Sequence, residues 1–379
     1  MGERPNEVEL ERLGVYDPGA PDAAEQLVLL TRAFELGATV DEVVRATHVF
    51  GLGPLMLDLV MRPPGETQRL AEFAEGSGLD PDLVHRLWVA LGLPDSNALP
   101  VPVTPDAAEA IRLIAAMTEL LGEDVVLALA RTYGSSLARM TEALSGAFRV
   151  GVEVPHRVAG TPYPQVVDDY TVLVRDLLPF FLDAVNALFR RHLVAVSYQL
   201  RDTDEEHAAV TLDRTVGFAD LVGSTEVLRT LSVKELAEMV RRFEEQAWDL
   251  VSRAGGRVVK LIGDEAMFVV GDPVRACDVG LELVETPAQP VRVGLAHGPV
   301  VELYGDYYGE TVNLAARLVR SAAPSALLVS QTVRDSARVS FTFPSLDRLV
   351  LKGFVERCRS TGCRGSYKAA SSTMERSSA

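Results

Sequence analysis

Two hydrophobic patterns divide the chain. Through the first 200 residues, apolar positions recur every three to four residues, the spacing of amphipathic helices, and Gly or Pro interrupts them. Beyond about residue 210, short apolar runs alternate with helical segments. The pattern therefore predicts an α+β protein. We expect an all-helical domain over 1–200, a charged linker over 201–210, a second domain over 211–368 and a disordered Ser-rich tail over 369–379.

In the first domain, helical periodicity predicts a series of helices. We expect them at Asp22–Leu36, Glu42–Val49, Leu52–Met61, Thr67–Gly76, Asp80–Leu91, Thr104–Leu121, Glu123–Arg131, Ser135–Arg149 and Tyr170–Tyr198. Pro155–Pro164 contains Pro and Gly and is expected to be a loop. The apolar cluster within Leu55–Met61 could line a lipid pocket or a dimer groove, although core packing is the simpler interpretation.

In the second domain the elements follow the order βαββαβ, with further short elements after them. We expect strands at Leu212–Leu221, Arg257–Ile262, Ala266–Val270, Val291–Leu303, Ala326–Val329, Phe341–Phe343 and Leu346–Leu351. We expect helices at Val233–Arg253, Pro273–Val284, Gly309–Ser321 and Gln331–Ala337. This order is ferredoxin-like, and it predicts a mostly antiparallel sheet with helices on one face.

Charge is unevenly distributed. The formal net charge is −16. Residues 1–205 hold 31 acidic and 16 basic residues, whereas the remainder holds 22 and 21. Leu70–Trp88 has the outline of a helix-turn-helix, but its second helix offers only His85 and Arg86. An acidic domain binds a phosphate backbone poorly, so we favour an ordinary αα-hairpin and expect no nucleic-acid partner.

Cysteine usage and hydropathy bear on location. Cys277, Cys358 and Cys363 are too few and too poorly spaced for a zinc site or a disulfide framework. The N-terminus lacks an apolar leader, and charged residues and Pro179 interrupt Tyr170–Val196. We expect no transmembrane segment and a cytoplasmic location, and leave peripheral membrane attachment open.

Two apolar runs end at acidic residues. Thr215–Ala219 leads into Asp220, and a Gly223-Ser224-Thr225 turn then precedes a helical pattern. Such a turn is a natural phosphate seat, because free N–H groups and the helix dipole favour anions. The second run turns at Gly263 to place Asp264 at a hairpin tip. If the two strands are neighbours, Asp220 and Asp264 project together and suit a Mg²⁺ pair.

Three more side chains attract attention. Lys260 lies in an apolar strand, where an unpaired ammonium is costly, so it needs a partner or a ligand. Asn313 and Arg317 are four residues apart on one helix face. A guanidinium one turn from an amide suits a developing phosphoryl charge and a ribose oxygen.

These stretches resemble the catalytic core of class III nucleotide cyclases, over roughly residues 210–368. The resemblance implies metal ligands, an adenine-specifying pair and transition-state residues, which match respectively Asp220 and Asp264, Lys260 and Asp306, and Asn313 and Arg317. All six carry the residues of adenylate-forming members. The family's basic anchor for the β- and γ-phosphates has no clear match, and Lys352 is only a weak candidate for it.

The resemblance implies that the chain converts ATP to cyclic AMP and pyrophosphate with two Mg²⁺ or Mn²⁺ ions. It further implies a homodimer with two shared sites. Asp220, Asp264 and Lys260 then come from one chain, and Asn313 and Arg317 from its partner. A guanylate cyclase is opposed by the Lys260–Asp306 pair. A silent signalling scaffold is opposed by the complete set of site residues.

The helical half resembles the regulatory domain of soluble mycobacterial-type cyclases, which implies autoinhibition with acid pH or a fatty acid as the input. His192 and His207 flank the linker and titrate near neutrality, so they are candidate acid sensors. Two solvated surface histidines are an equally good interpretation. His297 lies in a strand beside Gly298 and Pro299 and is assigned a structural place.

Overall fold

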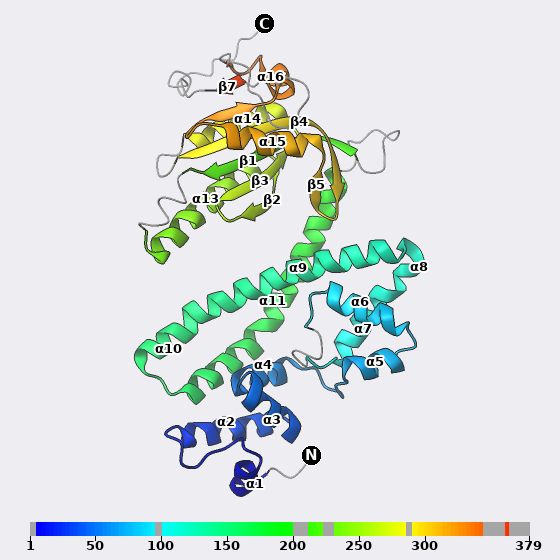
Figure 1. Cartoon of the computed structure of the whole chain (residues 1–379), viewed down its shortest axis with the longest axis vertical. Helices are drawn as coiled ribbons and strands as arrows, with labels where there is room; N and C mark the ends of the chain where they lie inside the picture. Colours follow the sequence, from blue (N-terminus) through cyan, green and yellow to red (C-terminus); the bar gives the residue numbers. More distant parts are fainter. Residues whose placement is uncertain are drawn as a thin grey trace. The chain divides into compact units, whose positions relative to one another are not determined.

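In the computed structural model, residues 5–94, 101–199, 211–222, 231–285, 290–343 and 361–363 are described. The chain divides into two compact units, Met1–Arg201 and Asp202–Ala379. The first is all helical, and the second is built on a β-sheet (Figure 1). Among the described residues, no helix has the length and apolar character needed to span a bilayer.

The first unit consists of α-helices and one short π-helical segment. Their bounds are α1 Glu7–Arg12, α2 Ala23–Glu35, α3 Val40–Val49, α4 Leu52–Met61, α5 Leu70–Gly76, α6 Pro81–Ala90, α7 Pro105–Ala116, α8 Thr118–Leu121, α9 Glu123–Phe148, η1 Arg149–Glu153, α10 Val154–Ala159 and α11 Tyr163–Gln199. Helix starts follow local sequence signals. Before α3, for example, the Thr39 hydroxyl accepts the Glu42 N–H, and the Glu42 carboxylate accepts the Thr39 N–H.

Two separate cores stabilise this unit. One joins α1 to α4 and the start of α11, and it buries Leu30, Met56 and Val167. The other joins α5, α6, α7 and α9, and it buries Phe73 and Trp88. The helix-turn-helix outline is therefore a packed helical hairpin in the second core. Leu55 and Met56 are likewise core residues, as the simpler interpretation had it.

Helix α9 is continuous, whereas the sequence predicted a break near Gly134. The helix needs this glycine for contact with α6. A Cβ at Gly134 would lie 2.4 Å from the carbonyl carbon and oxygen of Leu91. A residue that looks like a helix breaker is therefore a close-approach site, a use of glycine that periodicity does not distinguish from a break.

The segment expected to be a loop is largely helical. Residues 149–153 form η1, and 154–159 form α10, with Pro155 in its first turn. Helix α11 then begins at Tyr163, seven residues before the predicted start. Prolines at helix starts explain the error, because a first-turn residue needs no N–H partner within the helix.

The second unit holds a seven-stranded sheet in the order β2-β3-β1-β4-β6-β7, with β5 paired to β4 alone. Among the strands that the structure describes, only the β4–β6 pair is parallel. The elements are β1 Thr211–Leu221, α13 Val233–Arg253, β2 Arg257–Ile262, β3 Glu265–Val270, α14 Pro273–Val284, β4 Val291–Leu303, β5 Asp306–Tyr308, α15 Glu310–Ser321, β6 Leu327–Val329, α16 Gln331–Ala337 and β7 Thr361–Cys363. The α+β class and the main strands agree with the sequence prediction.

Some details differ from the prediction. The short strands β5 and β7 were not predicted, and residues 341–343 form no strand. The predicted strand at 346–351, the linker and the tail lie outside the described residues. Three-residue strands carry too little periodicity to be read from sequence, because pairing alone defines them.

Helices cover both faces of the sheet, not one as the sequence suggested. Helices α13, α14 and α16 share a core with Ala219, Phe268 and Leu295. Helix α15 packs on the opposite face, against Val216 and Met267. Residues 215–221 of β1 are buried without alternation, as expected of a strand covered on both sides.

Close packing fixes α15 on its face. A Cβ at Gly294 of β4 would lie 2.3 Å from the backbone nitrogen of Val319 and 2.6 Å from the carbonyl oxygen of Ala315. The helix backbone therefore rests directly on the strand at this point. This contact sets the distance between α15 and β4, and therefore the positions of Asn313 and Arg317.

Candidate active site

The backbone segments that carry Asp220 and Asp264 lie side by side at the end of β1. Asp220 pairs across the ladder with Glu265, and the Leu221 N–H donates to the Asp264 carbonyl oxygen at 3.1 Å. Asp220 follows Val216 and Phe218 at the strand period of two, so it points to the α15 face. The Asp220 side chain is only 12% exposed. The two predicted metal ligands thus lie on neighbouring backbone segments.

Arg292, which is not among the residues predicted from the sequence, holds Asp220 in place. Its Nε and Nη2 lie 2.7 Å and 2.5 Å from Oδ2 of Asp220. A paired guanidinium offsets the cost of burying the carboxylate. Arg292 is a charged residue in the apolar run of β4, as Lys260 is in β2. The desolvation rule that singled out Lys260 therefore applies to it equally.

Glu265 is a third acidic group at this edge. Burial raises its pKa, and the nearby negative charges of Asp220 and Asp264 add to that shift. Arg320 and Arg292 act in the opposite direction. The site therefore concentrates carboxylates that two arginines only partly neutralise.

Lys260 and Asp306 form a direct ion pair. The Lys260 ammonium donates to Oδ2 of Asp306 at 2.5 Å, although 46 positions separate them. Lys260 pairs across the ladder with Met267, which faces α15, so the ammonium lies on the same face as Asp220. The partner that a lysine in an apolar strand requires is therefore Asp306, supplied by β5.

Asn313 and Arg317 lie on successive turns of α15, as predicted. Asn313 is exposed, and Arg317 is half-buried. The helix start is fixed by Thr311, whose buried hydroxyl donates to the Pro299 carbonyl oxygen at 2.8 Å. Together with the Gly294 contact, this hydrogen bond ties the helix to β4 at both ends.

Three predicted features lie outside the described residues. They are the Gly223-Ser224-Thr225 turn, the phosphate-anchor candidate Lys352, and His207. His192 is exposed on α11. His297 is half-buried; its Nδ1 lies 3.0 Å from the Thr215 hydroxyl, and burial lowers its pKa. Its backbone contacts the start of α16: its N–H donates to the Ser330 hydroxyl, and its carbonyl oxygen accepts from the Thr332 hydroxyl.

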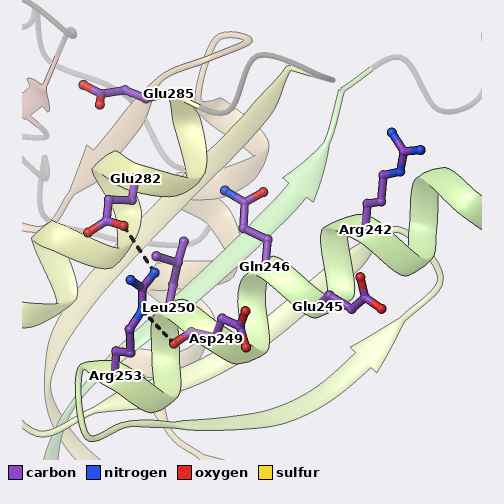
Figure 2. Close-up of a pocket in the computed structure, with 8 residues that line it drawn as sticks. All are labelled: Arg242, Glu245, Gln246, Asp249, Leu250, Arg253, Glu282 and Glu285. Carbon is purple, nitrogen blue, oxygen red and sulfur yellow. Dashed lines mark hydrogen bonds and ion pairs between the residues drawn. The ribbon is translucent and has the colours of Figure 1, made fainter.

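A separate depression lies between α13 and α14, and Figure 2 shows it. Arg253 crosses part of it, donating to the Asp249 carbonyl oxygen at 3.3 Å and lying 3.6 Å from the Glu282 carboxylate. These helices cover the sheet face opposite α15. The hollow is therefore remote from the predicted residues. Arg253 and Glu282 approach each other within it, whereas Arg242 and Glu245 pair with other residues of α13.

The acidic edge fits divalent cations. Asp220 uses Oδ2 for Arg292, and no contact to its Oδ1 is seen among the described residues; Asp264 adjoins it through the backbone contact to Leu221. Among the described residues, no three His, Cys, Asp or Glu side chains form a complete cage. Mg²⁺ needs only one or two protein carboxylates, since phosphates and water complete its octahedron.

Comparison with known proteins shows what this chain is similar to. The adenylate and guanylate cyclase catalytic domain matches residues 207–363. An adenylate cyclase of Streptomyces coelicolor is 34% identical over 292 residues, which is 74% of each chain. An uncharacterised protein of Mycobacterium tuberculosis is 34% identical over 365 residues, covering 91% of this chain and 90% of its own.

A further relative concerns regulation. A pH-sensitive adenylate cyclase of Mycobacterium tuberculosis is 29% identical over 335 residues. The match covers 84% of this chain and 82% of that protein. In all three relatives the similarity extends well beyond the catalytic domain into the helical unit.

Proposed function

The chain belongs to the adenylate and guanylate cyclase family, and we propose that it is an adenylate cyclase, which converts ATP to 3′,5′-cyclic AMP and pyrophosphate. One observation carries the substrate assignment: the Lys260 ammonium and the Asp306 carboxylate are brought to 2.5 Å on the α15 face. A donor beside an acceptor matches the N1 and the exocyclic amine of adenine. Guanine presents the reverse order at these positions.

The catalytic residues have separate roles in the proposed reaction. Lys260 donates to adenine N1, and Asp306 accepts from the amine. Asn313 orients the ribose so that its 3′-oxygen can reach the α-phosphorus in line. The new bond forms there as the bond to the bridging oxygen of pyrophosphate breaks, and the hydroxyl proton leaves to solvent. Arg317 stabilises the charge that develops on the α-phosphoryl group.

Members of this family generally use divalent metal ions. Here Asp220 and Asp264 would hold two Mg²⁺ or Mn²⁺ ions, which supply Lewis-acid assistance to the attacking and leaving oxygens when bound. Arg292 restrains the Asp220 carboxylate for that purpose. The Gly223-Ser224-Thr225 turn is proposed to receive the triphosphate.

Synthesis of cyclic AMP tests this assignment directly. Purified protein with ATP and Mn²⁺ should release cyclic AMP, and GTP should give far less cyclic GMP. Preferred turnover of GTP would favour a guanylate cyclase instead. Absence of both products, from protein that still binds ATP, would favour a silent scaffold.

The site is proposed to be shared between two copies of the chain, with Asp220, Asp264 and Lys260 from one and Asn313 and Arg317 from the other. Asp220→Ala and Arg317→Ala chains should each be inactive alone. Mixed under conditions that exchange subunits, they should recover partial activity, because heterodimers contain one intact site. If proven heterodimers remain inactive, the site is not divided in this way.

Regulation by the helical unit is the second part of the proposal. A cavity of about 670 Å³ lies between α4, α9, η1 and α11. Its wall is mainly apolar, with Leu57, Phe148, Val166 and Tyr170; the charged residues that line it are Arg149, Glu142 and Glu153. This composition suits a fatty acid, whose chain needs apolar walls and whose carboxylate needs a cation.

Acid is the alternative input, sensed by His192 and His207. The full chain should be compared with a chain starting at Glu206, between pH 5.5 and 8 and with oleate added. Equal specific activity and equal pH profiles would remove the helical unit as a regulator. A cytoplasmic location, where ATP is abundant, completes the proposal.

A further inference from the structure

The β4–β5 hairpin carries Asp306 on a very short turn. Leu303 pairs with Asp306, so only Tyr304 and Gly305 connect the two strands. Both have positive φ, 51° and 81°, as a two-residue type I′ hairpin requires. The position of Asp306 is therefore set by the position of this turn.

The turn is held from a distant strand. Arg257, the first residue of β2, donates from Nη2 to the Gly305 carbonyl oxygen at 3.0 Å. Its guanidinium carbon lies 5.3 Å from the centre of the Tyr307 ring, and Nη2 is 3.9 Å from the Glu302 carboxylate. In sheet order, β3 and β1 lie between β2 and β4. The β4–β5 hairpin must therefore extend past both strands to make these contacts with Arg257.

Two basic residues of β2, three positions apart, contact this hairpin. Lys260 binds Asp306, and Arg257 binds the turn before it and the ring after it. Tyr307 is buried in the α15-side core, which gives the guanidinium a firm surface to stack on. When adenine N1 accepts a hydrogen bond from Lys260 and the exocyclic amine donates one to Asp306, the direct contact between the two side chains must loosen. The contacts of Arg257 then keep the hairpin near β2.

We propose that Arg257 is a specificity-determining positioning residue, which fixes the spacing between Lys260 and Asp306 and so the selection of adenine. This inference rests on the proposed function of that pair. Arg257 touches no reacting atom; it acts through the hairpin. An arginine suits this role, because its planar fork can stack on a ring and donate to a carbonyl at the same time.

The test compares Arg257→Gln with a matched control, Arg253→Gln. Arg253 also donates to a backbone carbonyl and approaches a carboxylate, but it does so on α13, beside the remote depression (Figure 2). The ligands are ATP and purine riboside triphosphate, which lacks the exocyclic amine that Asp306 would accept. Binding is measured in parallel with 3′-deoxy-ATP and 3′-deoxy-GTP, which cannot cyclise.

Arg257→Gln should raise KM for ATP by about 3- to 10-fold, the range of one charge-assisted hydrogen bond at a partly exposed site. Turnover at saturation should change less. Discrimination between ATP and purine riboside triphosphate should shrink by a similar factor. In Asp306→Asn protein, the same arginine change should have little further effect on that discrimination.

Equal losses for both nucleotides, or the same binding selectivity in the Arg257 and Arg253 variants, would overturn the inference and leave Arg257 a structural contact. Failure of the proposed function looks different. The parent protein would then make no cyclic AMP, while the 3′-deoxynucleotide binding would still report whether Arg257 governs selection of the base.

Discussion

The two units bury their apolar side chains in different ways. The catalytic unit places one continuous sheet between two cores, so Ala219 and Met267 are almost fully enclosed on opposite faces. The helical unit has two smaller cores, and the long α11 leaves the first of them. Val167 and Val174 are buried near its start, whereas Phe180 and Leu188 are 72% and 59% exposed.

The catalytic unit therefore suits the precise positioning of side chains, and the helical unit suits a response to a partner or ligand. Side chains on a sheet enclosed on both faces keep fixed spacings, as chemistry at a phosphorus atom requires. Large exposed apolar side chains along a helix mark a surface that gains stability from a partner or ligand. Changes in the catalytic unit should therefore affect rate and selectivity. Changes in the helical unit should affect stability or response.

The largest expected effect tests the precise side of this comparison. Asp220→Ala should lower turnover of ATP by about 1,000-fold or more, because several kcal/mol of charge stabilisation are lost. The fold should persist, since Arg292 and Asp220 contribute a pair and not a core contact. Turnover and circular dichroism are the measurements. Asp213→Ala, an exposed position on the same strand, is the control. Near-normal turnover in the Asp220 variant would refute its role.

A smaller loss is expected from reversing the base-reading pair. Lys260→Glu combined with Asp306→Cys should reduce ATP turnover by about 100-fold, because a polar site rejects a mismatched edge. The pair is about one-third exposed, which limits the effect. Gain of GTP turnover should be slight, because the surrounding residues are unchanged. A double variant with parental ATP turnover would exclude both residues from base recognition.

The contact beneath α15 should give an intermediate effect. Gly294→Ala places a methyl group against the helix backbone, which must move away from β4. We expect about 1–3 kcal/mol of lost stability and a ~10-fold loss of turnover as Arg317 shifts. Gly271→Ala, where a Cβ meets nothing within 4 Å, serves as the matched control. Equal turnover in the two variants would show that the distance between α15 and β4 does not affect catalysis.

The matching change in the helical unit sharpens the contrast. Gly134→Ala also forces a methyl group into a backbone, that of Leu91, and should cost about 1–3 kcal/mol, less up to ~1 kcal/mol of gained helix propensity. Thermal unfolding should report the loss, while KM for ATP stays unchanged. Gly146→Ala, which meets nothing within 4 Å, is the control. A changed KM would show that packing in the helical unit reaches the site.

The smallest effect concerns acid stability. Burial lowers the pKa of His297 in the folded state, so the unfolded chain, with a value near 6.5, binds the proton more readily. The stability from His297 is therefore complete above pH ~6.5 and is lost as the pH falls toward its folded pKa. Urea unfolding at pH 7.5 and 5.5 should show a steeper acid loss for the parent than for His297→Asn. The same change at exposed His48 should leave the slope unchanged.

The catalytic unit was the more predictable one, for physical reasons. Its strands and helices follow one another at short intervals, and each has a clear period or cap, such as the Ser232–Glu235 box before α13. Charged residues within apolar strands pointed to the site. Arg292 could have been found by that rule, but its partner could not, because pairing depends on the order of strands in the sheet.

The helical unit was harder to delimit. Gly134 and Pro155 resemble breaks in one dimension, yet one lies at a helix contact and the other in a first turn. Whether a glycine ends a helix or admits a neighbour depends on tertiary contacts. Strand β5 was not predicted for a related reason. Three residues are too few to show an alternating pattern, and only the hairpin to β4 defines them as a strand.

Because the turn at Tyr304 and Gly305 has only two residues, its length determines how β5 pairs with β4. Most surface loops tolerate insertions at little cost in free energy. Here a single added or deleted residue would shift the pairing of β5 by one place, and alternation would turn Asp306 to the opposite side of the hairpin. No residue of the site need be substituted for its chemistry to be lost. Among homologous chains, a change in the length of this turn is therefore as informative as a change at the aspartate.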